Sequence, residues 1–402
     1  MLGRLFGRKT FDHGVHPPGF KSGTRDKTIR RLAFAPRLYI PLAQHIGKPS
    51  RCCVKVGQEV VRGEPIAEAD GFLSVPLHAP ATGYIEAIKL MPSAKGPKLE
   101  TIVLKVYESA SQEVLYGGEL DTAAMTPEEI IQAVQASGMV GLGGAAFPSH
   151  AKLSVPEGHR IDTFLVNGCE CEPYLTTDQR IMVEKTDALI EGIRLAMRAV
   201  GAPRAVIGVE DNKPDAIAAI RQRLSENDPI SLGVVETKYP QGAEKTLIKA
   251  LLGKEVPSGK HSYDVGVCTN NVGTLAQIGS LLPKGEGLIE RVVTVDGPAV
   301  EKPGNYLVPI GTPLEFLLEQ VGVNQCDVEV ILGGPMMGNA IASLNIPITK
   351  GISGVLVFGK QNIGAESRKR HPCIKCGQCV QACPMNLNPS QLGLLAAKRE
   401  YE

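Results

Sequence analysis

The spacing of apolar residues after position 126 predicts alternating helices and strands. Thr126, Pro127 and two glutamates have the residue types that begin a helix, and an apolar stripe then continues until Gly138. Residues 205–210 have the pattern of a buried strand, residues 214–224 that of an amphipathic helix, and residues 232–236 that of another strand. A strand, a helix and a strand in this order form a βαβ unit. The central part of the chain is therefore predicted to be α/β with a largely parallel sheet.

The two flanking regions have a different pattern. Before residue 116, short β-type runs at 52–56, 75–77, 84–88 and 102–106 are separated by Pro and Gly, which predicts a small β-rich domain. After residue 291, short strands return with one helix near 313–321. We expect a β domain at 1–115, an α/β domain at 116–285, a second small domain at 286–350, a linker at 351–369 and a cysteine-bearing segment at 370–402.

Composition indicates a globular protein with reduced thiols. The 402 residues are 43% hydrophobic, and 43 Lys and Arg against 42 Asp and Glu give a net charge of +1, so we expect no nucleic-acid partner. The ten cysteines are typical of cytosolic thiols and not of a disulfide framework. The basic start lacks an apolar signal region, and no stretch approaches a membrane span. We expect a soluble chain that can dock on a membrane complex.

A cysteine run near the C-terminus carries the strongest chemical signal. Cys373, Cys376, Cys379 and Cys383, followed by Pro384, have the C-x2-C-x2-C-x3-C-P spacing of bacterial [4Fe–4S] ligands. A structural zinc site is the alternative, because C-x2-C pairs also bind zinc. In two-cluster ferredoxins the fourth cysteine of each run serves the other cluster, so the first three are predicted to ligate one cluster and the fourth another. With one run, the chain looks cut short or completed by a partner.

Glycines and polar strand ends carry a second signal. Gly141, Gly143 and Gly144 allow backbone amide groups to approach a flat or phosphorylated ligand, although a plain glycine-rich turn explains them equally well. The loop follows a predicted helix, which disfavours a dinucleotide fingerprint, since that motif follows a strand. Polar groups also follow the strands predicted at 163–166 and 263–268. Such strand ends form the ligand crevice of open α/β sheets, but the same residues also cap helices.

Several segments together resemble known families. Residues 54–66 and 78–85 resemble the lipoyl and biotinyl barrel-sandwich domain, with Ala69-Asp70-Gly71 where the carrier lysine is expected. Residues 141–152, 167–173, 239–245 and 270–274 resemble the FMN and NADH fold of the flavoprotein subunit of respiratory complex I, and residues 291–313 resemble its soluble ligand-binding β-grasp (SLBB) domain. With the ferredoxin-type end, the order resembles the C subunit of Rnf/Rsx ion-translocating oxidoreductases.

This resemblance implies a Rossmann-like α/β core that binds FMN and NAD(H), with two [4Fe–4S] clusters expected in the family. The cofactor-binding residues that it implies are Gly141, Gly143, Gly144, Phe147, Lys152, Asn167, Glu170, Glu172, Gly242, Glu244, Asn270, Asn271 and Thr274. Phe147 is expected to stack on the nicotinamide nucleotide, and the glutamates to contact its sugars. Cys169 and Ala243 depart from the complex I pattern, which has acidic residues there.

The predicted function is electron transfer between NAD(H), FMN and iron–sulfur clusters. A hydride carries two electrons and a cluster accepts one, so a flavin has to stand between them. The family implies a peripheral subunit on the cytoplasmic face of the cell inner membrane, with membrane subunits as partners and ferredoxin reached through the complex. The alternatives are a soluble NADH dehydrogenase or hydrogenase flavoprotein subunit, and a flavin-free scaffold that carries clusters. No catalytic acid or base is predicted.

Overall fold

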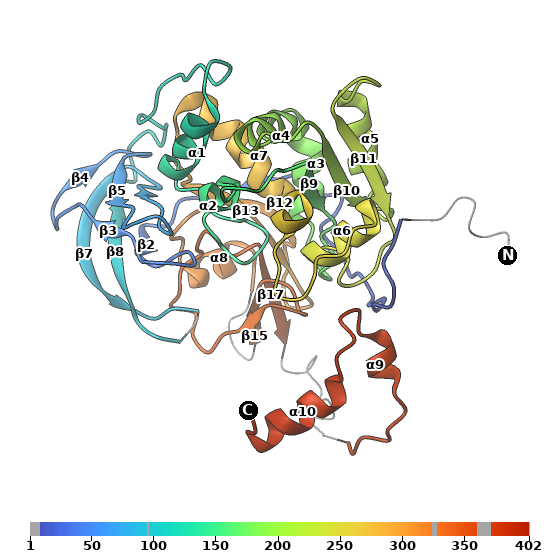
Figure 1. Ribbon diagram of the computed structural model, residues 1–402. Helices are drawn as coiled ribbons and strands as arrows, with labels where there is room; N and C mark the ends of the chain where they lie inside the picture. The colour runs from blue at the N-terminus through green and yellow to red at the C-terminus, as the bar shows by residue number, and fades with distance from the viewer. Residues whose placement is uncertain (1–8, 95, 324–327, 360–370, 402) are drawn as a thin grey trace.

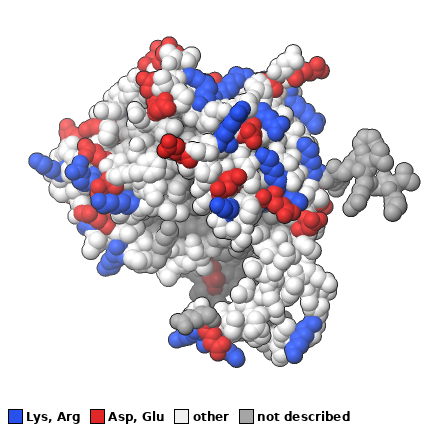
Figure 2. All heavy atoms as spheres, viewed as in Figure 1, with Lys and Arg blue, Asp and Glu red and all other residues white. Residues whose placement is uncertain are grey.

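The computed structural model describes residues 9–94, 96–323, 328–359 and 371–401. A four-stranded parallel sheet lies at the centre, with a β-rich unit beside it, a six-stranded sheet below and two short helices at the C-terminal end (Figure 1). Positive and negative side chains are interspersed on the face shown in Figure 2, where a hollow lies beside the junction between the body and the C-terminal segment. Within the described ranges, no helix combines the length and apolar character needed to cross a bilayer.

The central sheet confirms the predicted α/β core. Its strands lie in the order β11-β10-β9-β12, and every neighbouring pair is parallel. The strands are β9 Thr163–Gly168, β10 Ala205–Glu210, β11 Ile230–Val235 and β12 Val267–Asn271. The helices are α1 Pro127–Ala136, α2 Ser149–Leu153, α3 Thr177–Glu184, α4 Thr186–Val200, α5 Pro214–Arg223, α6 Glu244–Leu252 and α7 Val272–Leu281, with 3₁₀ turns at Ser262–Val265 and Leu282–Lys284.

Local sequence signals explain these elements well. Thr126 accepts a hydrogen bond from the Glu129 amide at 3.3 Å, and the Glu129 carboxylate accepts one from the Thr126 amide at 2.8 Å, so the predicted start of α1 is a capping box. Strand β9 has apolar residues on both faces, such as Phe164, Leu165 and Val166, because helices cover the sheet on both sides. The strand predicted at 263–268 was wrong in position, since 262–265 form a 3₁₀ turn before β12.

The β-rich unit consists of two small antiparallel sheets around one core. One has the order β2-β8-β7-β4 and the other β3-β5-β6. Their inward side chains, including Ile66, Ile85 and Leu104, are fully buried against one another. The strands are β2 Arg37–Pro41, β3 Arg51–Cys52, β4 Glu59–Val60, β5 Pro65–Glu68, β6 Leu77–His78, β7 Gly83–Met91 and β8 Leu99–Val106.

The third unit is a six-stranded sheet that corrects two predicted boundaries. Its order is β1-β14-β13-β17-β15-β16, with the strands β1 Arg30–Arg31, β13 Glu290–Asp296, β14 Gly304–Pro309, β15 Val328–Leu332, β16 Asn339–Ala340 and β17 Gly354–Gly359, and the helix α8 Leu314–Gln320. Strand β17 falls inside the predicted linker 351–369, which was therefore wrong at 354–359, where apolar side chains are buried between β13 and β15. The rest of that linker, 360–369, lies outside the described residues. Strand β1 falls inside the predicted domain 1–115 but pairs with β14.

A buried lysine joins the three units. Lys350 donates hydrogen bonds to the carbonyl oxygens of Pro76 at 3.0 Å and Gly138 at 2.6 Å, and its backbone amide donates to Gln44 Oε1 at 3.0 Å. Burial lowers the pKa of Lys350 to about 7. One side chain thus ties the six-stranded sheet to both the β-rich unit and the α/β unit.

The C-terminal cysteine segment carries two helices, α9 Gln378–Ala382 and α10 Pro389–Lys398. Neither helix has a buried residue, and in Figure 1 they lie below the main body.

Candidate functional site

The predicted site residues gather at the carboxyl edge of the parallel sheet. From β9 the chain continues through β10 to β11 on one side of the sheet and then returns to β12 on the other side of β9, and such a reversal of strand order creates a crevice at the carboxyl end. Asn167, near the end of β9, is the register partner of Asn271, the last residue of β12. Asn167 donates a hydrogen bond to the Gly242 carbonyl at 2.7 Å and accepts one from the Cys169 amide at 3.1 Å. Asn167 thereby fixes the loop before α6 against the end of β9.

The glycine loop lies against the other side of the crevice. The Leu142 amide donates to Thr274 Oγ1 at 2.9 Å, and the Gly141 amide donates to the Phe147 carbonyl at 2.8 Å. A Cβ atom on Gly143 would lie 3.3 Å from the Asn271 side chain, whereas one on Gly144, where φ is +123°, would have no neighbour within 4 Å in the described chain. Gly143 and Gly144 are exposed. The loop therefore presents an open stretch of backbone to a ligand.

Lys152 and Glu244 form an ion pair at the same edge. Lys152, on α2, lies 3.0 Å from the carboxylate of Glu244, the first residue of α6, and each side chain is 36% exposed. The fold thus brings together two predicted residues that are 92 positions apart in sequence. Half-exposed pairs of this kind are weak, so the lysine remains available to an anionic ligand.

The structure supports helix capping for two predicted residues. The Glu170 carboxylate accepts hydrogen bonds from the Asp178 amide at 2.7 Å, the Gln179 amide at 3.2 Å and the Thr177 hydroxyl at 3.0 Å, all at the start of α3. Asn271 Oδ1 accepts from the amides at the start of α7. Both side chains hold helix ends at the crevice, and the expected sugar contact of Glu170 stays a prediction.

Glu172 points toward the six-stranded sheet. Its carboxylate accepts a hydrogen bond from the Met336 amide at 3.0 Å, while burial raises its pKa. Together with Gly143 and Gly144 it lines a cavity of about 520 Å³ between the glycine loop, the loop 333–338 and the β-rich unit. The cavity adjoins the open glycines, so a ligand lying on them would also meet the other two units.

Three buried polar residues at the crevice lack partners. Gln241 is fully buried and neither atom of its amide group has a hydrogen-bond partner within the described chain, and the same holds for Asn270 Nδ2 and Thr269 Oγ1. Unpaired buried polar groups are costly, and hydrogen bonds to a polar ligand would remove that cost. Asn270 was predicted, whereas Gln241 and Thr269 were missed because their burial cannot be seen in the sequence.

Two lysines far from the predicted motifs stabilise the crevice loops. Lys21 donates to the carbonyl oxygens of Glu170 and Glu172 at 2.9 Å each and to that of Leu175, and burial lowers its pKa to about 8. Lys213 is fully buried and donates to Glu210 at 2.7 Å and to the Cys169 carbonyl at 3.2 Å. Only folding brings these cations to the loop after β9, so motif spacing gave no signal for them.

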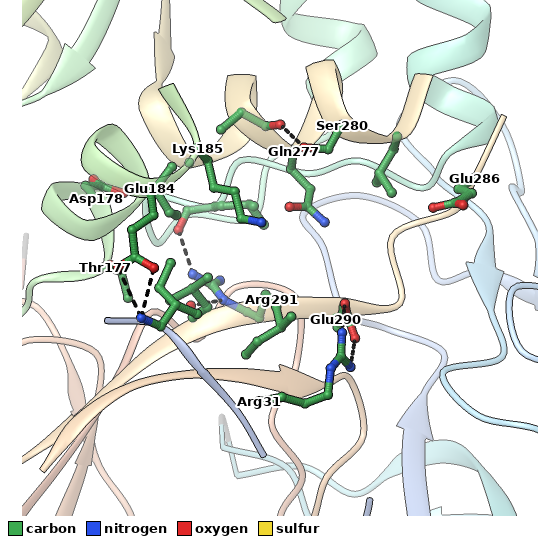
Figure 3. Close-up of a pocket in the computed structure, with 18 of the residues that line it drawn as sticks. Arg31, Thr177, Asp178, Glu184, Lys185, Gln277, Ser280, Glu286, Glu290 and Arg291 are labelled. Carbon is green, nitrogen blue, oxygen red and sulfur yellow. Dashed lines mark hydrogen bonds and ion pairs between the residues drawn. The ribbon is translucent and has the colours of Figure 1, made fainter. Parts of the chain in front are cut away.

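A second cavity lies behind Asn271. It has a volume of about 400 Å³ and is lined by residues of α3, α7 and β13, including Asp178 and Arg291 (Figure 3). Asp178 accepts a hydrogen bond from Asn271 Nδ2 at 2.7 Å, and burial followed by the charge of Glu170 raises its pKa to about 7. Burial lowers the pKa of Arg291 to about 10. The protonation of Asp178 is therefore linked to Asn271, the residue that caps α7.

Comparisons with known proteins agree with this order of units. Three family models match: the RnfC barrel sandwich hybrid domain over residues 9–108, the Nuo51 FMN-binding domain over residues 134–280 and the SLBB domain over residues 292–340. The C subunit of the proton-translocating ferredoxin:NAD(+) oxidoreductase complex of Clostridium ljungdahlii is 40% identical over 397 residues, covering 98% of this chain and 86% of that protein. The chain belongs to this family of C subunits.

Other members of this family are longer. The C subunit of the ion-translocating oxidoreductase complex of Pasteurella multocida is 40% identical over 98% of this chain, and that of Haemophilus influenzae strain PittEE is 38% identical over the whole of this chain. This chain spans only 47% and 62% of those two proteins. Among solved structures, an air-oxidised NAD+-reducing [NiFe]-hydrogenase has a TM-score of 0.53 and 23% identity, covering 69% of this chain and 54% of that one. That likeness shows the fold alone.

The cysteines of this RnfC-family chain are accessible but spread out. Cys373, Cys376 and Cys379 are exposed and Cys383 is half-buried. The Lys375 amide donates to Cys373 Sγ at 3.4 Å and lowers the pKa of that thiol, which favours the thiolate that binds metals. Across the described ranges, no three metal-binding side chains converge. The donor chemistry thus fits an iron–sulfur cluster, while the described arrangement does not gather the ligands.

Proposed function

We propose that this chain passes electrons between NAD(H), FMN and [4Fe–4S] clusters as a peripheral, NADH-linked flavoprotein subunit of an ion-translocating complex. In this proposal, membrane subunits hold it at the cytoplasmic face of the inner membrane and connect it to ferredoxin. The proposal is supported by the open glycine loop, the Lys152–Glu244 pair at the start of α6, and the unpartnered buried amide groups of Gln241, between β11 and α6, and of Asn270, near the end of β12. The FMN-binding description of the matched family model and the printed name of the Clostridium relative support it.

FMN, when bound, supplies the change from two-electron to one-electron chemistry. The residues of this chain fit it in three ways. The exposed backbone of Gly143 and Gly144 admits a flat ring, Lys152 offers a positive charge, and Asn270 and Gln241 offer buried hydrogen-bonding groups. Asn167, Asn271 and Thr274 hold the surrounding loops in register.

The nicotinamide nucleotide is proposed to enter on the open side of the glycine loop. Phe147 is half-buried at the end of that loop, Glu172 lines the adjoining cavity, and Glu244 stands beside Lys152. A carboxylate near a nucleotide can accept hydrogen bonds from ribose hydroxyls. Cys373, Cys376, Cys379 and Cys383 are the proposed iron ligands, with the fourth directed to a separate cluster.

Asn270 provides a direct test. Its unpaired amide group should lower the stability of the free protein and strengthen the binding of the ligand. We expect Asn270→Leu to leave the unfolding free energy unchanged or raise it, since an unpaired buried donor is removed. FMN affinity is expected to fall by about tenfold, or ~1.4 kcal/mol, because the hydrogen bond to the flavin is lost. Exposed Asn227→Leu is the control.

The measurements are FMN titration and anaerobic bleaching of the bound flavin by NADH. Uptake of FMN near one equivalent, bleached by NADH and weakened by Asn270→Leu alone, supports the proposal. Protein that takes up no FMN would instead favour the flavin-free scaffold, and stoichiometric zinc in the cysteine segment would overturn the iron assignment.

A further inference from the structure

The N-terminal segment, residues 9–16, lies along the back of the loop that leads into the candidate site. Val15 and Tyr239 exchange two backbone hydrogen bonds, at 2.9 and 2.8 Å, and the Glu236 amide donates to the Lys9 carbonyl at 3.1 Å. Tyr239 is followed within five residues by Gln241, Gly242 and Glu244. The N-terminal segment is therefore attached directly to the chain that carries site residues.

Lys238 holds this attachment in place. Its buried ammonium group donates to the carbonyl oxygens of Phe11 and of His13, the latter at 3.1 Å, and lies 4.0 Å from the centre of the Phe11 ring. These two carbonyl acceptors and the aromatic face satisfy the ammonium group together with the Glu236 carboxylate, which lies 4.0 Å from it. Loss of this group would release the N-terminal segment from the site loop.

The opposite edge of the same segment touches the cysteine segment. The Gly14 amide donates to the carbonyl of Ala382 at 2.9 Å, and Ala382 directly precedes Cys383. A cavity of about 310 Å³ lies between residues 11–13, α6 and residues 384–386. In Figure 1 the blue N-terminal segment lies next to α9. Among the four cysteines of the run, only Cys383, beside this contact, is half-buried.

Gly14 is the residue that permits both contacts. Its φ is +90°, which L side chains rarely adopt, and a Cβ atom there would lie 2.9 Å from the Tyr239 carbonyl oxygen and 3.1 Å from the Phe11 ring. A larger residue would push the segment away from the site loop and turn its amide away from Ala382. The same glycine thus faces the site loop on one side and the cysteine helix on the other.

We propose that the N-terminal segment is the docking surface that holds the cysteine segment beside the nucleotide site, with Lys238 and Gly14 as positioning residues. This rests on the proposed function, because the distance between the site and the cluster matters only if electrons pass between them. The contact runs through the backbone of Ala382, so it fixes the chain next to a ligand without occupying the ligand itself. A donor and an acceptor held in one geometry react faster than a flexibly tethered pair.

The test uses two measurements on metal-free protein. The alkylation rate of each cysteine is followed by mass spectrometry, and the hydrogen exchange of the Gly14 amide is measured in parallel. Cys383 is expected to react several-fold more slowly than Cys379 in the unmodified chain. Lys238→Met and Gly14→Ala are expected to remove this protection and speed exchange at residue 14, while Lys238→Arg keeps it. Lys254→Met is the control, because Lys254 also donates to a backbone carbonyl, that of Val265, away from these contacts.

A positioning role also has to be distinguished from a general loss of folding by a measurement of electron transfer. In protein reconstituted with FMN, iron and sulfide, Gly14→Ala is expected to lower the rate of cluster reduction by NADH several-fold relative to reduction of ferricyanide, which tests the flavin site alone. Equal alkylation of Cys383 and Cys379 in the unmodified chain, or an unchanged ratio in Gly14→Ala, would overturn the inference. Failure to bind FMN would refute the proposed function instead, since cysteine protection is measured without flavin.

Discussion

Removing Lys213 should destabilise the end of the central sheet more than any exposed substitution. Lys213 and Glu210 are 0% and 1% exposed, and their charged atoms lie 2.7 Å apart. Burial opposes the charge on Lys213, but the carboxylates of Glu210 and Glu170 outweigh it and raise its pKa. Lys213→Met leaves Glu210 buried without its partner, and breaking such a pair costs about 3–5 kcal/mol.

A double variant shows how much of the loss in Lys213→Met comes from the Glu210 carboxylate that is left buried without a partner. Glu210→Gln combined with Lys213→Met leaves no buried charge, so we expect it to recover about 2 kcal/mol relative to Lys213→Met alone. Because the chain contains no Trp, urea unfolding is best followed by circular dichroism.

The pH dependence has a definite sign. Without Lys213 the pKa of Glu210 should rise further above its unfolded value, so the folded state binds the proton more tightly. The loss in Lys213→Met should therefore be smaller near pH 5 and grow as the pH rises toward 8. A loss below about 1 kcal/mol, or a double variant as unstable as the sum of the two single ones, would refute the reasoning.

Three further predictions concern the crevice. Gly143→Val should weaken FMN binding at least tenfold, about 1.4 kcal/mol, with little change in the melting temperature, because its side chain would crowd Asn271 and the open loop; fluorescence titration of FMN measures this. Lys152→Met should weaken FMN binding and make that binding less dependent on salt, whereas Glu244→Gln should strengthen FMN binding because the lysine loses its partner. FMN titrations at low and high salt distinguish the two variants, and equal effects on affinity would contradict the ion pair. Because the pKa of Asp178 is raised to about 7, Asp178→Asn should gain stability relative to the unmodified chain as the pH rises from 4 to 7, by at most ~1.4 kcal/mol per pH unit. Urea unfolding at several pH values measures this, and a stability difference that does not change with pH would show that Asp178 ionises normally.

The sequence predicted the α/β core because helix starts and buried strands depend largely on residues that are close together in the sequence. The capping residues of α1 and the apolar strand β10 match the prediction to the residue or nearly so. Strand β17 was assigned to a linker because residues 351–372 contain glycines and charges and have few apolar residues in their later half. Its strand conformation depends on pairing with β13 and β15, which the local pattern cannot reveal.

The candidate site was only partly predictable. Motif spacing located the glycine loop and Asn270, but it could not separate ligand groups from structural ones. Glu170 caps a helix, and Lys21 reaches the loop from 149 positions away. Gln241 is notable only because its buried amide has no partner within the described chain, a property of the packed structure.

Lys350 has a consequence for how this protein can be divided. Cutting away the β-rich unit would strip the ammonium group of the Pro76 oxygen and the Lys350 backbone amide of its Gln44 acceptor, yet leave the cation enclosed by the remaining halves. A fragment made of the α/β unit and the six-stranded sheet would therefore start with a poorly solvated positive charge at its newly cut surface. Expression of that two-unit fragment is expected to succeed when residue 350 is made apolar at the same time, or when all three units are kept together.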